Sequence, residues 1–235
     1  MSEIEIVFFD AGETLIHPHP SVPELFAQVC AENGIEVQPQ HVAEVQQQLA
    51  PFLTDLAEDT GVTAPSLHPE DSRTFWTFLY RRFLEELAVP EPELPAALYE
   101  RFSDSASYKV FDDVLPTLQA LDELGYRLGL ISNFEGWLEN ILIEQELGET
   151  FDVTVISGLE GVEKPDPRIY SIAIERAGVD PSRSVHVGDS PTMDVRPARE
   201  VGINAILLDR SGRYMDSAYS TIASLEELPQ VITKL

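Results

Sequence analysis

Five short apolar segments alternate with helical patterns along this chain. The segments are residues 4–9, 126–131, 153–156, 184–187 and 203–208. Continuous apolar runs of this length are typical of strands that are buried on both faces of a sheet. Because strands that alternate with helices build parallel sheets covered on both sides, the sequence predicts an α/β fold with a doubly wound parallel sheet.

Local signals predict where several of the helices begin and end. Asp113 is expected to cap a helix that ends near Gly125. Asp166 is expected to cap another helix, in which the next residue is a proline at the first helical position. Ser224 and Glu227 have the spacing of a capping box for the last helix. These helices all follow or precede predicted strands, as the α/β fold requires.

Residues 17–110 break the alternation, because they contain no convincing strand pattern. Four helical patterns occupy this region instead, starting near Val22, Val42, Phe75 and Leu94. Pro51 is expected to kink or break the second of them. The sequence therefore predicts a core of residues 1–16 and 111–235 with a helical region, residues 17–110, inserted after the first strand.

Composition excludes several classes of protein. The chain has 41 acidic and 15 basic residues, and its net charge of −26 disfavours nucleic acid and anionic membrane surfaces as partners. Its one cysteine, Cys30, excludes an intrachain disulfide and a cysteine-rich zinc site. No apolar run is long enough to span a membrane, and the first residues lack a signal-peptide pattern. We expect a cytoplasmic protein, and the oligomeric state stays open.

Four polar segments follow predicted strands at their carboxyl ends. They are Asp10–Leu15, Ile131–Asn133, Glu163–Pro167 and Gly188–Asp194. In a doubly wound sheet, ligands bind outside the carboxyl ends of the strands, where the winding reverses. We therefore expect these four segments to converge on one site.

The residue types in these segments suit phosphoryl transfer by a carboxylate nucleophile. Asp10 could attack a phosphate only if a hard cation such as Mg²⁺ offset the repulsion between them, and Asp189 and Asp194 offer further oxygen ligands. Lys164, one of only three lysines in the chain, could neutralise the growing negative charge. The Ser132 hydroxyl and nearby backbone N–H groups could hold phosphate oxygens.

In their order and content, the motifs FFDAGETLI, LISN, EKPDPRIY and HVGDSPTMD resemble those of the haloacid dehalogenase superfamily of hydrolases. The resemblance covers nearly the whole chain. It implies a Rossmann-like catalytic core with strand order 5-4-1-2-3, which places Asp10 and Asp189 on adjacent strands. It also implies that residues 17–110 form a cap over the active site.

The resemblance further implies a role for each matching residue. Asp10 is expected to be the nucleophile and Lys164 the residue that stabilises charge, with Ser132, Asn133 and Lys164 contacting the substrate. The implied metal site consists of Asp10, the backbone carbonyl of Gly12, Asp189 and Asp194, with Asp194 acting through water or from behind the direct ligands. The expected activity is Mg²⁺-dependent hydrolysis of a small phosphorylated metabolite through an aspartyl-phosphate.

One position departs from the family pattern. Most phosphatases of the family carry a second aspartate two residues after the nucleophile, as general acid and base, whereas this chain has Gly12 there. Since a positioned acid or base contributes about 10²–10⁴-fold, we expect weak turnover of esters with poor leaving groups. Glu13 is a candidate replacement, although side-chain alternation turns it away from the direction of residue 12.

Two alternative functions remain open. A 2-haloacid dehalogenase also lacks the second aspartate and needs no metal, but it usually has an aromatic residue in place of Gly12 and lacks the acidic GDSPTMD loop. The loss of the acid at residue 12 is also consistent with a non-catalytic phosphate-binding or regulatory protein. Outside these motifs, His186 is expected to be a packed core residue, and the stripe of Phe75, Trp76, Leu79 and Phe83 to be the core of the inserted region.

Overall fold

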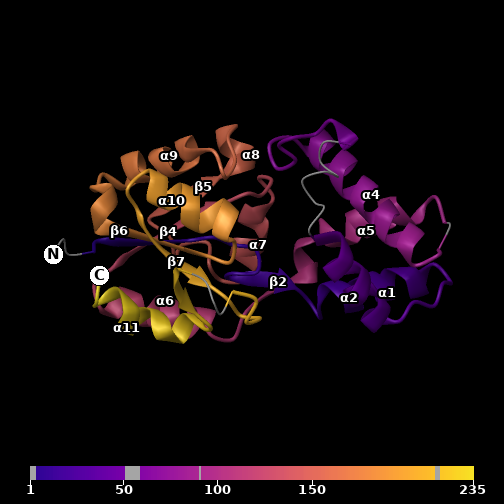
Figure 1. Cartoon of the computed structure of the whole chain (residues 1–235), viewed down its shortest axis with the longest axis horizontal. Coiled ribbons are helices and arrows are strands. Elements are labelled where there is room, and N and C mark those ends of the chain that lie inside the picture. Colours follow the sequence, from indigo (N-terminus) through magenta and orange to yellow (C-terminus); the bar gives the residue numbers. More distant parts are fainter. Residues whose placement is uncertain (1–3, 51–58, 90, 215–217) are drawn as a thin grey trace. The chain divides into compact units, whose positions relative to one another are not determined.

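The chain forms two compact units in a computed structural model that describes residues 4–50, 59–89, 91–214 and 218–235 (Figure 1). One unit consists of Met1–His17 together with Val110–Leu235, and the other is Pro18–Lys109. Within the described ranges, no helix is both long enough and apolar enough to cross a bilayer.

A six-stranded parallel sheet forms the centre of the first unit. Its strands are, in spatial order, β5 (Val153–Ile156), β4 (Arg127–Ser132), β1 (Ile6–Phe9), β6 (Ser184–Gly188), β7 (Asn204–Leu208) and β8 (Ser220–Ile222). The predicted α/β fold is confirmed, with the first strand in the middle and two of the other predicted strands on each side. All four residues of β1 are fully buried, as a strand covered on both faces requires.

Helices cover both faces of this sheet. In Figure 1, α9 and α10 lie on one side of it and α6 and α11 on the other. The helices of this unit are α6 (Val114–Glu123), α7 (Leu138–Glu144), α8 (Ser157–Glu160), α9 (Pro167–Ala177), α10 (Arg196–Glu200) and α11 (Leu228–Ile232). Asp166 caps α9 through the Arg168 N–H, and the predicted capping box of Ser224 and Glu227 is present before α11.

The second unit is built from helices around its own apolar core. They are α1 (Val22–Glu32), α2 (Pro39–Leu49), α4 (Pro69–Glu86) and α5 (Leu94–Phe102). Phe75, Leu79 and Phe83 of α4 are buried in this core, but Trp76 is 40% exposed, so its expected place in the core was wrong. Trp76 instead lies partly in solvent, with its ring stacked beside that of the buried Tyr80. The break predicted at Pro51 lies outside the described residues.

Three short strands were not predicted. β2 (Ile16–Pro18) and β3 (Tyr108–Val110) pair with each other at the two ends of the inserted region, where no strand was expected, and β8 extends the main sheet. Each is only three residues long and has no continuous apolar run. Their pairing depends on which segments the fold brings together, so periodicity could not reveal it.

Asp113 has a different role from the predicted one. It precedes α6, but its side chain makes no capping hydrogen bond to that helix. Its carboxylate instead accepts two hydrogen bonds from Arg210, at 2.8 and 2.9 Å, and one each from the Ser224 hydroxyl and the Leu225 N–H. Burial raises the pKa of the Asp113 carboxyl, but these donors outweigh burial and hold the pKa below its ordinary value.

We expect Asp113→Asn to lower the free energy of unfolding by about 1–3 kcal/mol near neutral pH, because it removes the charge that four donors share. Since the folded-state pKa is lowered, the stabilisation is present above the ordinary aspartate pKa of about 3.9 and disappears as pH falls through the folded value. Urea unfolding at several pH values would measure the difference in the free energy of unfolding between wild type and variant. The exposed neighbour Asp112, changed to Asn, is the control. A difference in free energy that stays constant down to low pH would contradict this account.

Candidate active site

Strand pairing brings the predicted site segments to one edge of the sheet. β1 lies between β4 and β6, with Phe9 beside Leu130 on one side and Val187 on the other. The N–H of Asp10 continues this pairing by donating to the Val187 carbonyl at 2.9 Å. The residues that follow these three strands therefore meet at their carboxyl ends.

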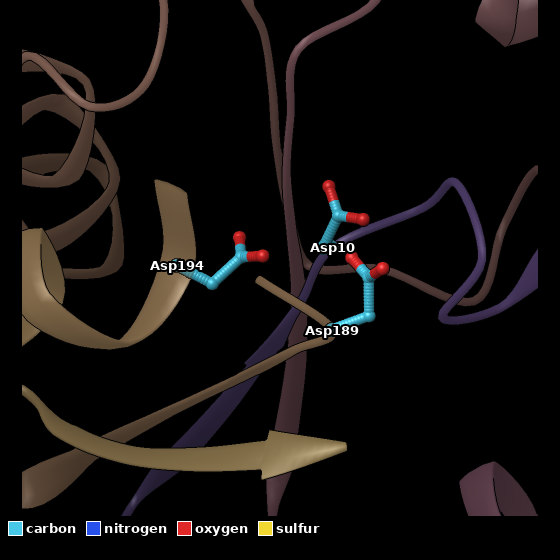
Figure 2. Close-up of side chains that lie close together, drawn as sticks. All are labelled: Asp10, Asp189 and Asp194. Carbon is cyan, nitrogen blue, oxygen red and sulfur yellow. The ribbon is translucent and has the colours of Figure 1, made fainter. Parts of the chain in front are cut away.

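The carboxylates of Asp10, Asp189 and Asp194 form one cluster. An oxygen from each lies within 4.8 Å of an oxygen from the other two. Figure 2 shows the three side chains pointing toward one another from separate segments of the chain. Asp10 follows β1, Asp189 follows β6, and Asp194 lies in a helical turn, Pro191–Val195, that comes directly after.

Lys164 connects two members of this cluster. Its ammonium group lies 2.6 Å from Asp10 Oδ1 and 2.7 Å from Asp194 Oδ1, and the residue is only 3% exposed. Burial lowers the pKa of Lys164, but the two carboxylates outweigh burial and raise it above its ordinary value. Lys164 therefore stays charged beside Asp10.

The electrostatics of the cluster favour a bound cation. Burial raises the pKa of the Asp189 carboxyl to about 8, and repulsion from Asp10 and Asp194 adds to the rise. Burial also raises the pKa of Asp10, and the attraction of Lys164 offsets only part of this. Three carboxylates thus share one ammonium group, and their hard oxygen atoms are the ligands that Mg²⁺ prefers. The residues of this site fit that ion.

Ser132 is the last residue of β4 and Asn133 follows it, and their side chains reach two different parts of the site. The Ser132 hydroxyl donates to Asp10 Oδ1 at 3.3 Å. The Asn133 side chain binds the backbone of Lys164 twice, donating to its carbonyl at 2.8 Å and accepting from its N–H at 2.7 Å. Asn133 therefore holds the segment that carries Lys164, a contact that the motif alone did not predict.

The turn after Asp10 leaves space where an acid is expected. A Cβ atom built on Gly12 would meet no atom within 4 Å, and the backbone there is not in the left-handed region. Glu13 does have left-handed backbone, with φ of 57°, and its N–H donates to the Ile16 carbonyl at 2.8 Å. The side chain of Glu13 is exposed. Glycine at residue 12 is thus not required by backbone strain or by crowding.

Three residues that support Asp194 were missed as site residues. His186 is buried as predicted, but its Nε2 also lies 3.0 Å from Asp194 Oδ1. The ring of Tyr170 packs edge-on against His186, and its hydroxyl donates to the carbonyl of Met193. Gly188 leaves room for Asp194, because a Cβ there would lie 2.3 Å from Asp194 Cγ. The available signal was that residues 186 and 188 share one face of a strand that ends at the site.

We expect Gly188→Ala to destabilise the protein by about 1–3 kcal/mol, because the added methyl group overlaps the Asp194 carboxylate. Gly12→Ala adds the same group where nothing lies within 4 Å and serves as the control for stability. Thermal and urea unfolding of both variants would measure the difference. Equal stability of the two variants would contradict the close packing of Asp194 on Gly188.

Comparisons with known proteins show which family this chain belongs to. A family model described as haloacid dehalogenase-like hydrolase matches residues 4–202. Haloacid dehalogenase-like hydrolase domain-containing protein 3 of Danio rerio is 32% identical over 235 residues, covering 95% of this chain and 94% of that protein. Glyceraldehyde 3-phosphate phosphatase of Methanopyrus kandleri is 33% identical over 221 residues, covering 91% of this chain and 87% of that protein.

A solved structure gives the same result. The crystal structure of a HAD phosphatase from Thermococcus onnurineus is 25% identical and superposes with a TM-score of 0.63, covering 97% of this chain and 98% of that one. The family predicted from the four motifs is confirmed. This chain belongs to the haloacid dehalogenase-like hydrolases.

Proposed function

We propose that this protein is a Mg²⁺-dependent phosphomonoester hydrolase that acts through an aspartyl-phosphate on a small phosphorylated metabolite in the cytoplasm. The observation that carries the proposal is the contact between the Lys164 ammonium and Asp10 Oδ1, 2.6 Å, inside a cluster of three carboxylates. The name of the Methanopyrus kandleri relative, a glyceraldehyde 3-phosphate phosphatase, supports phosphate esters as the substrate class.

Asp10 and Asp189 are the side chains that would hold the metal directly, together with the Gly12 carbonyl. Asp194 would support it from behind, because hydrogen bonds from Lys164, His186 and the Ser190 N–H already engage both of its oxygens. When bound, Mg²⁺ offsets the repulsion between a carboxylate and a phosphate and polarises the phosphate oxygens.

Asp10 is the proposed nucleophile. Lys164 and Ser132 both donate to its Oδ1 and so fix the orientation of the carboxylate. In the first step an Asp10 oxygen bonds to phosphorus while the bond to the leaving oxygen breaks, and in the second step water attacks phosphorus and frees Asp10. The Lys164 charge lies where negative charge grows in both steps, so it stabilises both transition states.

Replacing the proposed nucleophile tests this mechanism. We expect Asp10→Asn to lower kcat for p-nitrophenyl phosphate by about 10³-fold or more, because the amide oxygen is a far weaker nucleophile. Asp112→Asn, at an exposed position, is the control. Mass spectrometry of the intact protein during turnover would look for the phosphorylated form. Unchanged hydrolysis by purified Asp10→Asn would disprove the proposed mechanism.

The open space at Gly12 predicts a strong dependence on the leaving group. We expect aryl phosphates to react much faster than alkyl phosphates, because no side chain at residue 12 protonates the leaving oxygen. Gly12→Asp should raise kcat for alkyl phosphates by about 10²-fold, the lower end of what a positioned acid contributes. Gly12→Asn, which has the same size but no acid, is the matched control. Equal gains from both variants would show that the missing acid is not the cause.

Dehalogenation is the second candidate activity. It is favoured by the lack of an acid at residue 12 and by the 25% identity to a solved 2-haloacid dehalogenase from Pseudomonas syringae, which superposes with a TM-score of 0.63. Release of chloride from 2-chloropropionate in the presence of EDTA would support dehalogenation. Metal-dependent release of phosphate without release of chloride would support the phosphatase. Absence of both would favour a non-catalytic phosphate-binding or regulatory role.

A further inference from the structure

His186 is a fully buried histidine that the proposed mechanism does not use. It lies in β6, two residues before the strand ends, with an exposed fraction of 0%. Its Nε2 atom lies 3.0 Å from Asp194 Oδ1, and Asp194 is itself only 1% exposed. A polar contact buried this completely is costly to leave unsatisfied, so each partner strongly constrains the other.

The surroundings of the ring determine which nitrogen carries the proton. A carboxylate oxygen can only accept a hydrogen bond, so Nε2 must be the donor to Asp194. Within the described part of the chain, His186 Nδ1 has no hydrogen-bond partner. The Tyr170 ring packs edge-on against the imidazole, with the ring centroids 5.3 Å apart, and holds the plane of His186. The geometry therefore assigns the Nε2–H tautomer to His186.

Asp194 transmits this constraint to the site. Its Oδ1 accepts from both His186 and the Lys164 ammonium, and its Oδ2 accepts from the Ser190 N–H at 3.0 Å. Because both oxygens accept hydrogen bonds, the carboxylate cannot rotate without losing at least one of these contacts. Since Lys164 bridges Asp194 and Asp10, the orientation of Asp194 helps to decide where the ammonium lies relative to the nucleophile.

We propose that His186 is a positioning residue, which orients Asp194 and through it holds the Lys164 ammonium against Asp10. The side-chain hydrogen bond of His186 goes to Asp194 and not to Asp10, so the proposed effect of His186 is on the placement of Lys164. The catalytic part of this inference depends on the proposed hydrolase activity, whereas the placement of Lys164 can be measured without any substrate.

A matched pair of variants separates the effect of losing the hydrogen bond from the effect of changing the side-chain volume. His186→Gln keeps an N–H donor near the position of Nε2, and His186→Met has a similar shape without a donor. We expect His186→Met to lower kcat for p-nitrophenyl phosphate by about 10- to 100-fold, with KM within about threefold of wild type. His186→Gln should recover most of the lost kcat. His41→Met, at an exposed position of α2, is the control for a histidine-to-methionine change.

Two NMR measurements test the placement directly, in the protein without substrate. The ¹⁵N shifts of the His186 ring should show a protonated Nε2 and a bare Nδ1 in wild type, and this reading needs no variant. The ammonium resonance of Lys164 should be visible in wild type, because the buried contacts slow its exchange with water, and lost or shifted in His186→Met but not in His186→Gln.

The outcomes are distinct. A bare Nε2, or a Lys164 ammonium resonance unaffected by His186→Met, would overturn the positioning role even in an active phosphatase. If Gln and Met variants lose kcat equally while both remain folded, the hydrogen bond is not the cause and the proposal is wrong. If wild type hydrolyses no phosphate ester, the proposed function and the catalytic effect of His186 both fail, and the two resonances still decide whether His186 holds Lys164 in place.

Discussion

The buried Lys164 ammonium is the group on which the rest of the site depends. It lies between Asp10 and Asp194, and removing it would leave two buried carboxylates close together with no cation to offset their repulsion. A buried ion pair contributes little to stability by itself, because the cost of removing both charges from water offsets their attraction. Its value here lies in geometry, since it fixes the carboxylate of Asp10, the proposed nucleophile, beside a positive charge.

Lys164, Asp10 and Asp194 are each held by a polar partner from another segment of the chain. Lys164 and Asp10 are separated by 154 positions, and Asn133 fixes the backbone of Lys164 from the end of β4. Asp194 packs on Gly188 and accepts a hydrogen bond from His186. The sheet supplies this convergence, because its parallel central strands all end at the same edge.

Periodicity was sufficient for five of the six strands of the main sheet, because strands that are buried on both faces leave continuous apolar runs. It failed for β2, β3 and β8, whose three residues each carry no such run, and for Trp76, which lies on the exposed side of α4 despite its apolar ring. Asp113 shows a further limit. Its position suited a helix cap, but Arg210 lies close enough in the folded chain to bind it instead, and a charged donor is the stronger partner.

The sequence by itself determined the chemical content of the site: a carboxylate after the first strand, a hydroxyl at the end of β4, one lysine and a pair of aspartates after β6, with glycine at residue 12. The tertiary structure alone decided the pairing of these groups, including the contact of His186 with Asp194 and the free volume over Gly12. The reason is physical. Residue types and strand ends are local properties of the chain, whereas hydrogen-bond partners and free volume depend on how distant segments pack against one another.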